Sequence, residues 1–177
     1  MPQDISAMKE LMLGLLDGSY RSMHQAVNGL SDQQAYWQPM PQSNSIGWLV
    51  WHMMRRRDYY SAVCHGEPHV WVTGGWHERI GPDEVATGFA DTPEQVYAFR
   101  PPFEAVVGYA DACQLAAVDR VARLTSELLD GEYLLDAGRG VQSGWRTLRP
   151  MVNDGINHAG QIGYLRGMLT GFGWQAF

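Results

Sequence analysis

Two residues with metal-ligating side chains lie four positions apart in the stretch NDGINHAGQIGYLRG, residues 153–167. A helical residue turns by about 100°, so Asp154 and His158 lie about 40° apart on one face of a helix. Side chains at this spacing can share a metal ion, as in H-E-x-x-H sites. A third ligand must come from elsewhere, and His52 is the candidate because it follows an apolar run. The alternative is structural: Asp154 and His158 form a hydrogen bond or a surface pair, and His52 is a satisfied core histidine.

Three glycines lie on the opposite face of the same predicted helix. Gly160, Gly163 and Gly167 fall at about 200°, 140° and 180° from His158. Each glycine costs about 1 kcal/mol of helix stability relative to alanine. Small residues in this pattern allow a second backbone to come close. We therefore expect close packing on this face, either within the bundle or across a homodimer.

Apolar residues recur at helical spacing over most of the chain. A capping-box pattern at 31–34 predicts a short helical turn that ends before Pro39. The start signal Thr-Pro-Glu-Gln at 92–95 is separated from the third long helix by two prolines at 101–102. Four long helices predict an all-α four-helix bundle with a long crossover loop. The predicted helices cover 4–28, 45–65, 103–129 and 147–170.

The predicted crossover loop, residues 66–92, has no sustained hydrophobic period. Loops of this length in compact domains are usually functional or disordered. Because this loop carries Trp71 and Trp76, we expect it to be ordered and packed. No strand signal is convincing, although VWV at 70–72 could form a short extended piece.

Composition excludes several classes of protein. The 177 residues, 45% of them apolar, suffice for one domain spanning 1–177, and no linker divides them. The net charge of −6 argues against nucleic-acid binding. No apolar stretch reaches the ~18–20 residues of a membrane span, and no signal peptide is apparent. The two cysteines, Cys64 and Cys113, are interpreted as buried bystanders, so we expect a soluble cytoplasmic protein.

One basic run interrupts the second long helix, at Arg55, Arg56 and Arg57. Its simplest interpretation is a solvated helix face that is partly paired with Asp58. The alternative is that Arg55 or Arg56 holds an acidic substrate.

Several motifs together resemble the DinB/YfiT-like superfamily of metalloenzymes. The matching residues are NSIGWLVWH at 44–52 and DGINHAGQIGYLRG at 154–167, which contains the H-x-G-Q core. Weaker matches are GLSDQQAYWQP at 29–39 and the VW…GGW segment at 70–76. The resemblance spans nearly the whole chain in the right order. It implies a four-helix bundle whose metal is held by three side chains, which by position are His52, Asp154 and His158.

Many relatives have histidine at the position of Asp154, so this chain departs from the common pattern. The mycothiol-dependent maleylpyruvate isomerase branch also has a carboxylate there. Two histidines and one carboxylate suit zinc first, and also nickel, iron(II) or manganese. The characterised branches attach or use low-molecular-weight thiols such as mycothiol, bacillithiol or glutathione. The resemblance therefore implies a metal-dependent thiol transferase or isomerase that acts on a small electrophile.

In that reading, the loop carrying Trp71 and Trp76 could cover the electrophile, and Arg55 or Arg56 could meet a carboxylate of the thiol. Two alternatives stay open. The first is a metal-dependent hydrolase that uses metal-bound water, for which the loop offers only Glu78 or Asp83 as a general base. The second is a non-catalytic dimeric stress or binding protein whose metal is structural or lost. Because a fold hosts many functions, the choice depends on the site.

Overall fold

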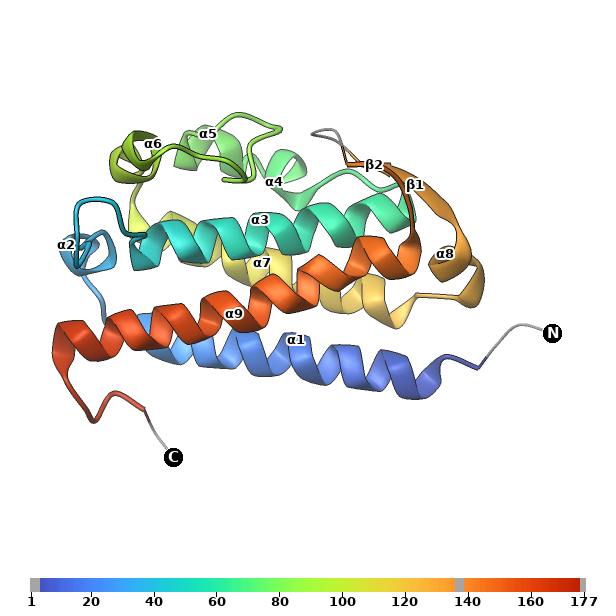
Figure 1. The fold of residues 1–177 in the computed structure, drawn as a ribbon, viewed down its shortest axis with the longest axis horizontal. Coiled ribbons are helices and arrows are strands. Elements are labelled where there is room, and N and C mark those ends of the chain that lie inside the picture. Colours follow the sequence, from blue (N-terminus) through green and yellow to red (C-terminus); the bar gives the residue numbers. More distant parts are fainter. Residues whose placement is uncertain (1–3, 136–138, 176–177) are drawn as a thin grey trace.

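Four long helices form the body of the protein in the computed structural model, which describes residues 4–135 and 139–175 (Figure 1). The helix α3 packs against α7 and α9, and α1 packs against α9 and α7. The predicted all-α fold is confirmed. The long helices are α1 (Ser6–Val27), α3 (Ile46–His65), α7 (Phe103–Ala122) and α9 (Gly144–Thr170).

Shorter elements connect the long helices at both ends of the bundle (Figure 1). Two short strands form an antiparallel hairpin in which Glu132 pairs with Ser143 and Leu135 pairs with Gly140. The segment between α3 and α7 lies over α3 and contains three short helices. The short elements are α2 (Asp32–Ala35), α4 (Val70–Thr73), α5 (Trp76–Ile80), α6 (Pro93–Ala98), α8 (Ser126–Asp130), β1 (Glu132–Leu135) and β2 (Gly140–Ser143).

Helix boundaries follow the capping signals of the sequence. Ser31 and Thr92 each form a full capping box, at the starts of α2 and α6. Ser45 caps α3 by accepting a hydrogen bond from the backbone N–H of Trp48. Gly66 ends α3 in the left-handed conformation, with φ of 61°. These helix ends are determined by interactions between residues close in sequence, so the sequence predicts them well.

Four of the expected details are wrong. The third long helix ends at Ala122 instead of residue 129, because Thr125 caps the new helix α8. The residues at 70–72 are helical, not extended, because a buried carboxylate of α3 accepts the first backbone N–H groups of α4. The hairpin was not expected, and α9 begins three residues early, at Gly144. A side chain at Gly144 would collide with the backbone of Leu128, so this start depends on tertiary packing.

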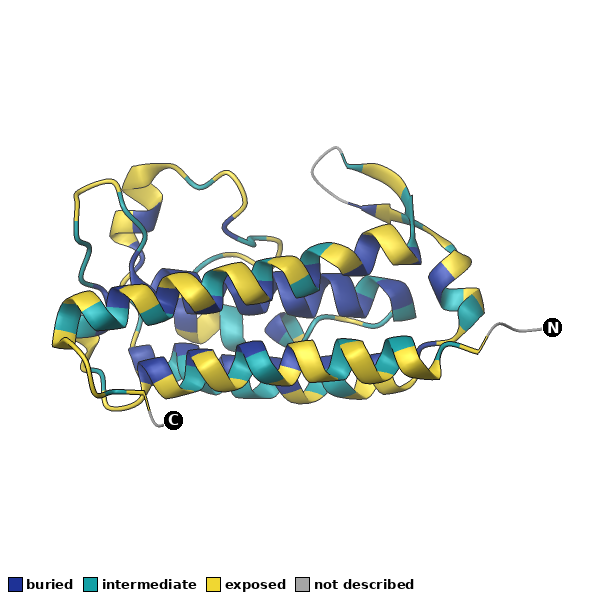
Figure 2. Cartoon of the chain, turned by 60° about the horizontal axis from the view of Figure 1, so that its bottom comes forward, coloured by how far each residue is buried: buried dark blue, intermediate teal, exposed yellow. Residues whose placement is uncertain are grey.

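The helix α3 is buried on all sides, because the bundle and the crossover segment enclose it. Of its residues, all but Val63 and His65 are buried. Figure 2 shows that exposed residues follow the outer faces of the long helices and that buried ones lie between them. In the described part of the chain, no helix has the length and apolar character needed to cross a membrane. Both cysteines are buried and free, as expected.

The basic run of α3 is therefore not a solvated face, and that interpretation is wrong. Arg55, Arg56 and Arg57 are all buried. Each of their guanidinium groups reaches a different neighbour: loop carbonyl oxygens, a carboxylate of α9, and polar groups of α1 and α7. Buried charged groups are normally paired in this way, so the run connects α3 to the crossover segment, α9, α1 and α7.

Candidate metal centre

Two of the three predicted metal ligands face each other across α3 and α9. The ring centroids of His52 and His158 are 5.1 Å apart, with 74° between the ring planes. His52 is buried, and His158 is partly exposed. The two helices run in opposite directions and lie side by side (Figure 1). The structure thus brings together histidines from opposite ends of the sequence.

Hydrogen bonds orient both imidazole rings. His52 Nδ1 lies 2.5 Å from the backbone oxygen of Thr87, and His158 Nδ1 lies 2.7 Å from Oε1 of Gln161. A carbonyl oxygen can only accept, so Nδ1 of each histidine carries the proton and donates it. When such a ring is neutral, Nε2 is the nitrogen that carries no proton. This is the arrangement in which a neighbouring oxygen prepares a histidine for metal binding.

The surroundings of His52 keep its ring neutral. Trp48 stacks on it, with centroids 4.8 Å apart and planes within 7°. The pKa of His52 is lowered from 6.5 to about 4, first by burial and then by the charges of His158 and Arg56. The hydrogen bond to Thr87 and the charge of Asp154 act in the opposite direction. A neutral imidazole is the form that binds metals.

The third predicted ligand, Asp154, is engaged in an ion pair. Its Oδ2 accepts a hydrogen bond from Nε of Arg56 at 2.8 Å, and both side chains are largely buried. His52 and Arg56 are one turn apart on α3, and Asp154 and His158 are one turn apart on α9. The two antiparallel helices therefore place histidine opposite histidine and arginine opposite aspartate. Among residues 4–135 and 139–175, no three His, Cys, Asp or Glu side chains are grouped closely enough to hold a metal.

The donor atoms nevertheless suit a divalent cation in kind. Two neutral imidazoles with Nδ1 occupied and one carboxylate form a common ligand set for zinc and for iron(II), nickel or manganese. A carboxylate that binds a metal is usually hydrogen-bonded by a neighbouring side chain as well. The Arg56 contact, which uses Oδ2 of Asp154, is compatible with that role.

Sequence reasoning missed the loop residues that complete the surroundings of His52. Thr87 supplies the hydrogen-bond acceptor, and Gly88 follows it with φ of 75°. A Cβ added at Gly88 would lie 2.8 Å from Nδ1 of His52 and 2.8 Å from the ring of Trp51. Glycine is therefore required for the loop backbone to approach the histidine. The only signal in the sequence was a glycine within a segment without periodicity.

The two loop tryptophans pack towards α7 instead of the histidine pair. Trp71 is fully buried, its Nε1 donates to the backbone oxygen of Asp83 at 2.9 Å, and its ring lies 5.0 Å from that of Tyr109. Trp76 also lies against Tyr109, at 6.0 Å, and carries Arg79 on its ring. These contacts anchor the crossover segment to the bundle. The tryptophan that touches a site histidine is Trp48.

The two arginines singled out as substrate contacts have different surroundings. Arg55 is fully buried, and its Nε donates to the backbone oxygen of Ala86 at 2.8 Å. It therefore fixes the crossover segment to α3. Arg56 is 8% exposed and lies beside the histidine pair through its contact with Asp154. Of the two, Arg56 is the one placed at the site.

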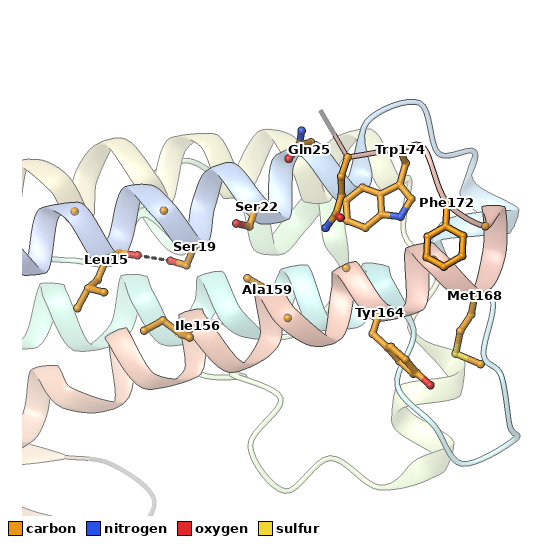
Figure 3. Close-up of a pocket in the computed structure, with 17 residues that line it drawn as sticks. Leu15, Ser19, Ser22, Gln25, Ile156, Ala159, Tyr164, Met168, Phe172 and Trp174 are labelled. Carbon is orange, nitrogen blue, oxygen red and sulfur yellow. Dashed lines mark hydrogen bonds between the residues drawn. The ribbon is translucent and has the colours of Figure 1, made fainter. Parts of the chain in front are cut away.

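The glycine face of α9 borders a groove next to α1 (Figure 3), and neither His52 nor His158 lines this groove. The groove has a volume of about 970 Å³. A Cβ at Gly163 would lie 3.3 Å from the ring of Trp174, which Figure 3 shows between the two helices, whereas one at Gly160 would meet nothing within 4 Å. Gly155, which is not one of these three glycines, is more crowded: a Cβ there would lie 2.9 Å from Arg57 Nη2 and 3.3 Å from Ser19 Oγ of α1. Among the described residues, Gly160, Gly163 and Gly167 thus meet at most the side chain of Trp174 and no second backbone, so the expected close backbone packing within the bundle is not found.

Comparisons with known proteins agree with this architecture. The crystal structure of a conserved protein from Enterococcus faecalis is similar, with a TM-score of 0.80 over 92% of this chain and 97% of that chain. The two sequences are 20% identical, so this similarity shows the fold alone. No curated protein matches the chain. A family model described as the DinB superfamily matches residues 15–162, which is most of the sequence. The chain therefore belongs to the DinB superfamily.

Proposed function

We propose that the protein is a metal-dependent enzyme that uses a low-molecular-weight thiol on a small electrophile. The metal would be a divalent cation held by His52, Asp154 and His158, with zinc as the first candidate. The single observation that supports this best is the pair of facing imidazoles, each with Nδ1 bound to an oxygen. Two histidines oriented in this way on different helices are hard to explain as a core contact alone.

The chain's own residues would divide the work of the site. His52 and His158 would present Nε2 as neutral donors, while Thr87 and Gln161 keep the rings from turning. Arg56 would hold the carboxylate of Asp154 in place through Oδ2. When bound, a divalent cation would stabilise the thiolate form of a thiol, which is the reactive nucleophile.

The segment around Gly88 would cover one side of the site. Its backbone lies against His52 and Trp48, so it keeps water from that side of the imidazole. Exclusion of water strengthens electrostatic interactions within a site. In this proposal the cover is therefore the segment at 87–89, and the loop tryptophans hold that segment in place.

Metal content is the first test. Untagged protein that has never met a chelating resin is analysed by elemental mass spectrometry, beside His52→Ala, Asp154→Ala and the control His24→Ala. His24 is on α1 and its side chain is 45% exposed, so replacing it should not change the metal content. We expect about one metal ion per chain in the wild type and the control, and a loss in both site variants. A wild type that stays free of metal after incubation with zinc, nickel, manganese and iron(II) would overturn the proposal.

The orientation of His158 gives a sharper test of the same site. Gln161→Ala removes the acceptor for Nδ1 and leaves the three ligands in place. Loss of such a supporting contact typically weakens metal affinity by about 10–100-fold. We expect this weakening in a competition titration with a chromogenic chelator, with an unchanged circular dichroism spectrum. Unchanged affinity would contradict the assigned ring orientation.

Thiol use is tested on the metal-loaded protein. Mycothiol, bacillithiol and glutathione are each offered with monochlorobimane, and fluorescence of the conjugate is followed. We expect a rate that requires the metal and is lost in Asp154→Ala. A metal-loaded protein that conjugates none of the three thiols would remove the thiol from the proposal.

A further inference from the structure

Two arginines share the same two aromatic rings next to Asp154. The guanidinium carbon of Arg56 lies 5.0 Å from the ring centre of Tyr60 and 5.5 Å from that of Phe89. The guanidinium carbon of Arg139 lies 4.4 Å from the ring centre of Phe89 and 5.6 Å from that of Tyr60. Arg139 comes from the turn before β2, and Phe89 comes from the crossover segment. Two separate loops thus meet over Tyr60 of α3.

The charges of this cluster are not balanced. Burial lowers the pKa of Arg139, and the positive charge of Arg56 lowers it further, while Tyr59 and Asp154 oppose these effects. Asp154 pairs with Arg56 through Nε. Within the described ranges, no carboxylate forms an ion pair with Arg139. One carboxylate therefore faces two guanidinium groups, and a second anion would be stabilised here.

A donor of Arg56 is also left without a partner. The residue is 8% exposed, and its Nη1 is buried without any hydrogen-bond partner among the described residues. A buried N–H of a charged group is costly when it stays unpaired. Phe89, whose ring lies against this guanidinium, is 57% exposed, so the cluster borders solvent. The position has the features of a site prepared for an acceptor from outside the chain.

We propose that Arg56 Nη1 and the guanidinium of Arg139 form a carboxylate-binding subsite beside the histidine pair. Arginine presents its N–H groups in a plane, which matches the two oxygens of a carboxylate. Tyr60 and Phe89 hold the two guanidinium planes in position by cation–π contacts. As a statement about the substrate, this inference rests on the proposed function: the thiol or the electrophile carries a carboxylate. The subsite itself does not need the metal.

Binding of a matched pair of probes tests the subsite. The probes are 3-mercaptopropionate and its methyl ester, which differ in the charge of the carboxylate. Each is titrated into the full chain, metal-free and zinc-loaded, while NMR follows the arginine Nε–H signals. We expect the acid to bind the metal-free protein at least about tenfold more tightly than the ester, as for a hydrogen bond to a charged group.

Variants localise the effect. Arg139→Gln should remove at least about tenfold of the affinity for the acid, and Arg139→Lys should restore part of it, because lysine keeps the charge without the planar fork. Arg79→Gln is the matched control, since Arg79 also lies on an aromatic ring, that of Trp76, in another part of the chain. Equal binding of acid and ester, or unchanged binding in Arg139→Gln, would overturn the inference. Carboxylate binding by a protein that takes up no metal would support the subsite and contradict only the proposed function.

Discussion

Asp58 is a buried carboxylate that joins three parts of the fold. It has no exposed surface, and it belongs to the middle of α3. Its two oxygens accept hydrogen bonds from the start of α4 and from two side chains of α7. An arginine of α3 itself also lies near this carboxylate. The contacts are the backbone N–H groups of Val70 (3.0 Å) and Trp71 (2.9 Å), Tyr109 Oη (3.2 Å), Arg120 Nη1 (3.0 Å) and Arg55 Nη1 (3.6 Å).

Replacing Asp58 by asparagine should destabilise the protein by about 3–5 kcal/mol, the usual cost of leaving a buried charge without its partner. Asparagine keeps the shape, but its amide nitrogen would face N–H donors. In this variant Arg120 still forms an ion pair with Glu67, whose Oε2 lies 3.0 Å from Nε of Arg120, so its charge keeps a partner. Most of the destabilisation should come from Arg55, because its Nη1 has no other partner among the described residues. Domains are stable by only about 5–15 kcal/mol, so this is a large fraction.

Urea unfolding followed by circular dichroism and tryptophan fluorescence measures this change. The control is Asp119→Asn, because Asp119 also pairs with an arginine, Arg123, but its side chain is 65% exposed. Such a surface pair is worth about 0–1 kcal/mol. We expect the control to unfold close to the wild type. If Asp58→Asn lost less than about 1 kcal/mol, the assignment of the carboxylate as the main tie between α3, α4 and α7 would be refuted.

Three further predictions concern the loop, the cysteines and the groove. Gly88→Ala should lower the free energy of unfolding in urea by about 2–4 kcal/mol, because its backbone is left-handed and its site is crowded. Gly66→Ala is the control: its backbone is also left-handed but has no neighbour within 4 Å, so the loss should be about 1–2 kcal/mol. Equal losses in the two variants would show that crowding at Gly88 contributes nothing. Ellman's reagent at pH 8 should leave Cys64 and Cys113 unreacted in the folded protein, because burial raises the pKa of both thiols; rapid labelling before unfolding would be the contrary result. The homodimer stays a prediction of the sequence. Light scattering should find a dimer in the wild type and a monomer in Gly160→Arg, because Gly160 lines the groove beside α1. A monomeric wild type would contradict this prediction.

The parts of the fold that sequence patterns predict are those fixed by local interactions. The long helices follow from apolar periodicity. Ser45 and Gly66 mark the ends of α3, and Ser31 and Thr92 mark the starts of the short helices α2 and α6, all through hydrogen bonds within a few residues. The helical turn at 70–72 could not be predicted, because its first N–H groups bind a carboxylate twelve and thirteen residues away. Gly144, which starts α9 early, is likewise explained only by the backbone of α8 beside it.

The candidate site follows the same division, with one exception. Asp154 and His158 share a face because they belong to one helix, whereas Thr87 reaches His52 through a loop whose course the sequence does not determine. The exception is Arg56. It lies one turn after His52, as Asp154 lies one turn before His158, and neighbouring antiparallel helices bring such pairs opposite each other. The sequence therefore predicts that His52 faces His158 and that Arg56 faces Asp154, once α3 and α9 are taken as antiparallel neighbours. What hid the ion pair was the assumption that three consecutive arginines must face water, which does not hold for a helix that the rest of the bundle encloses.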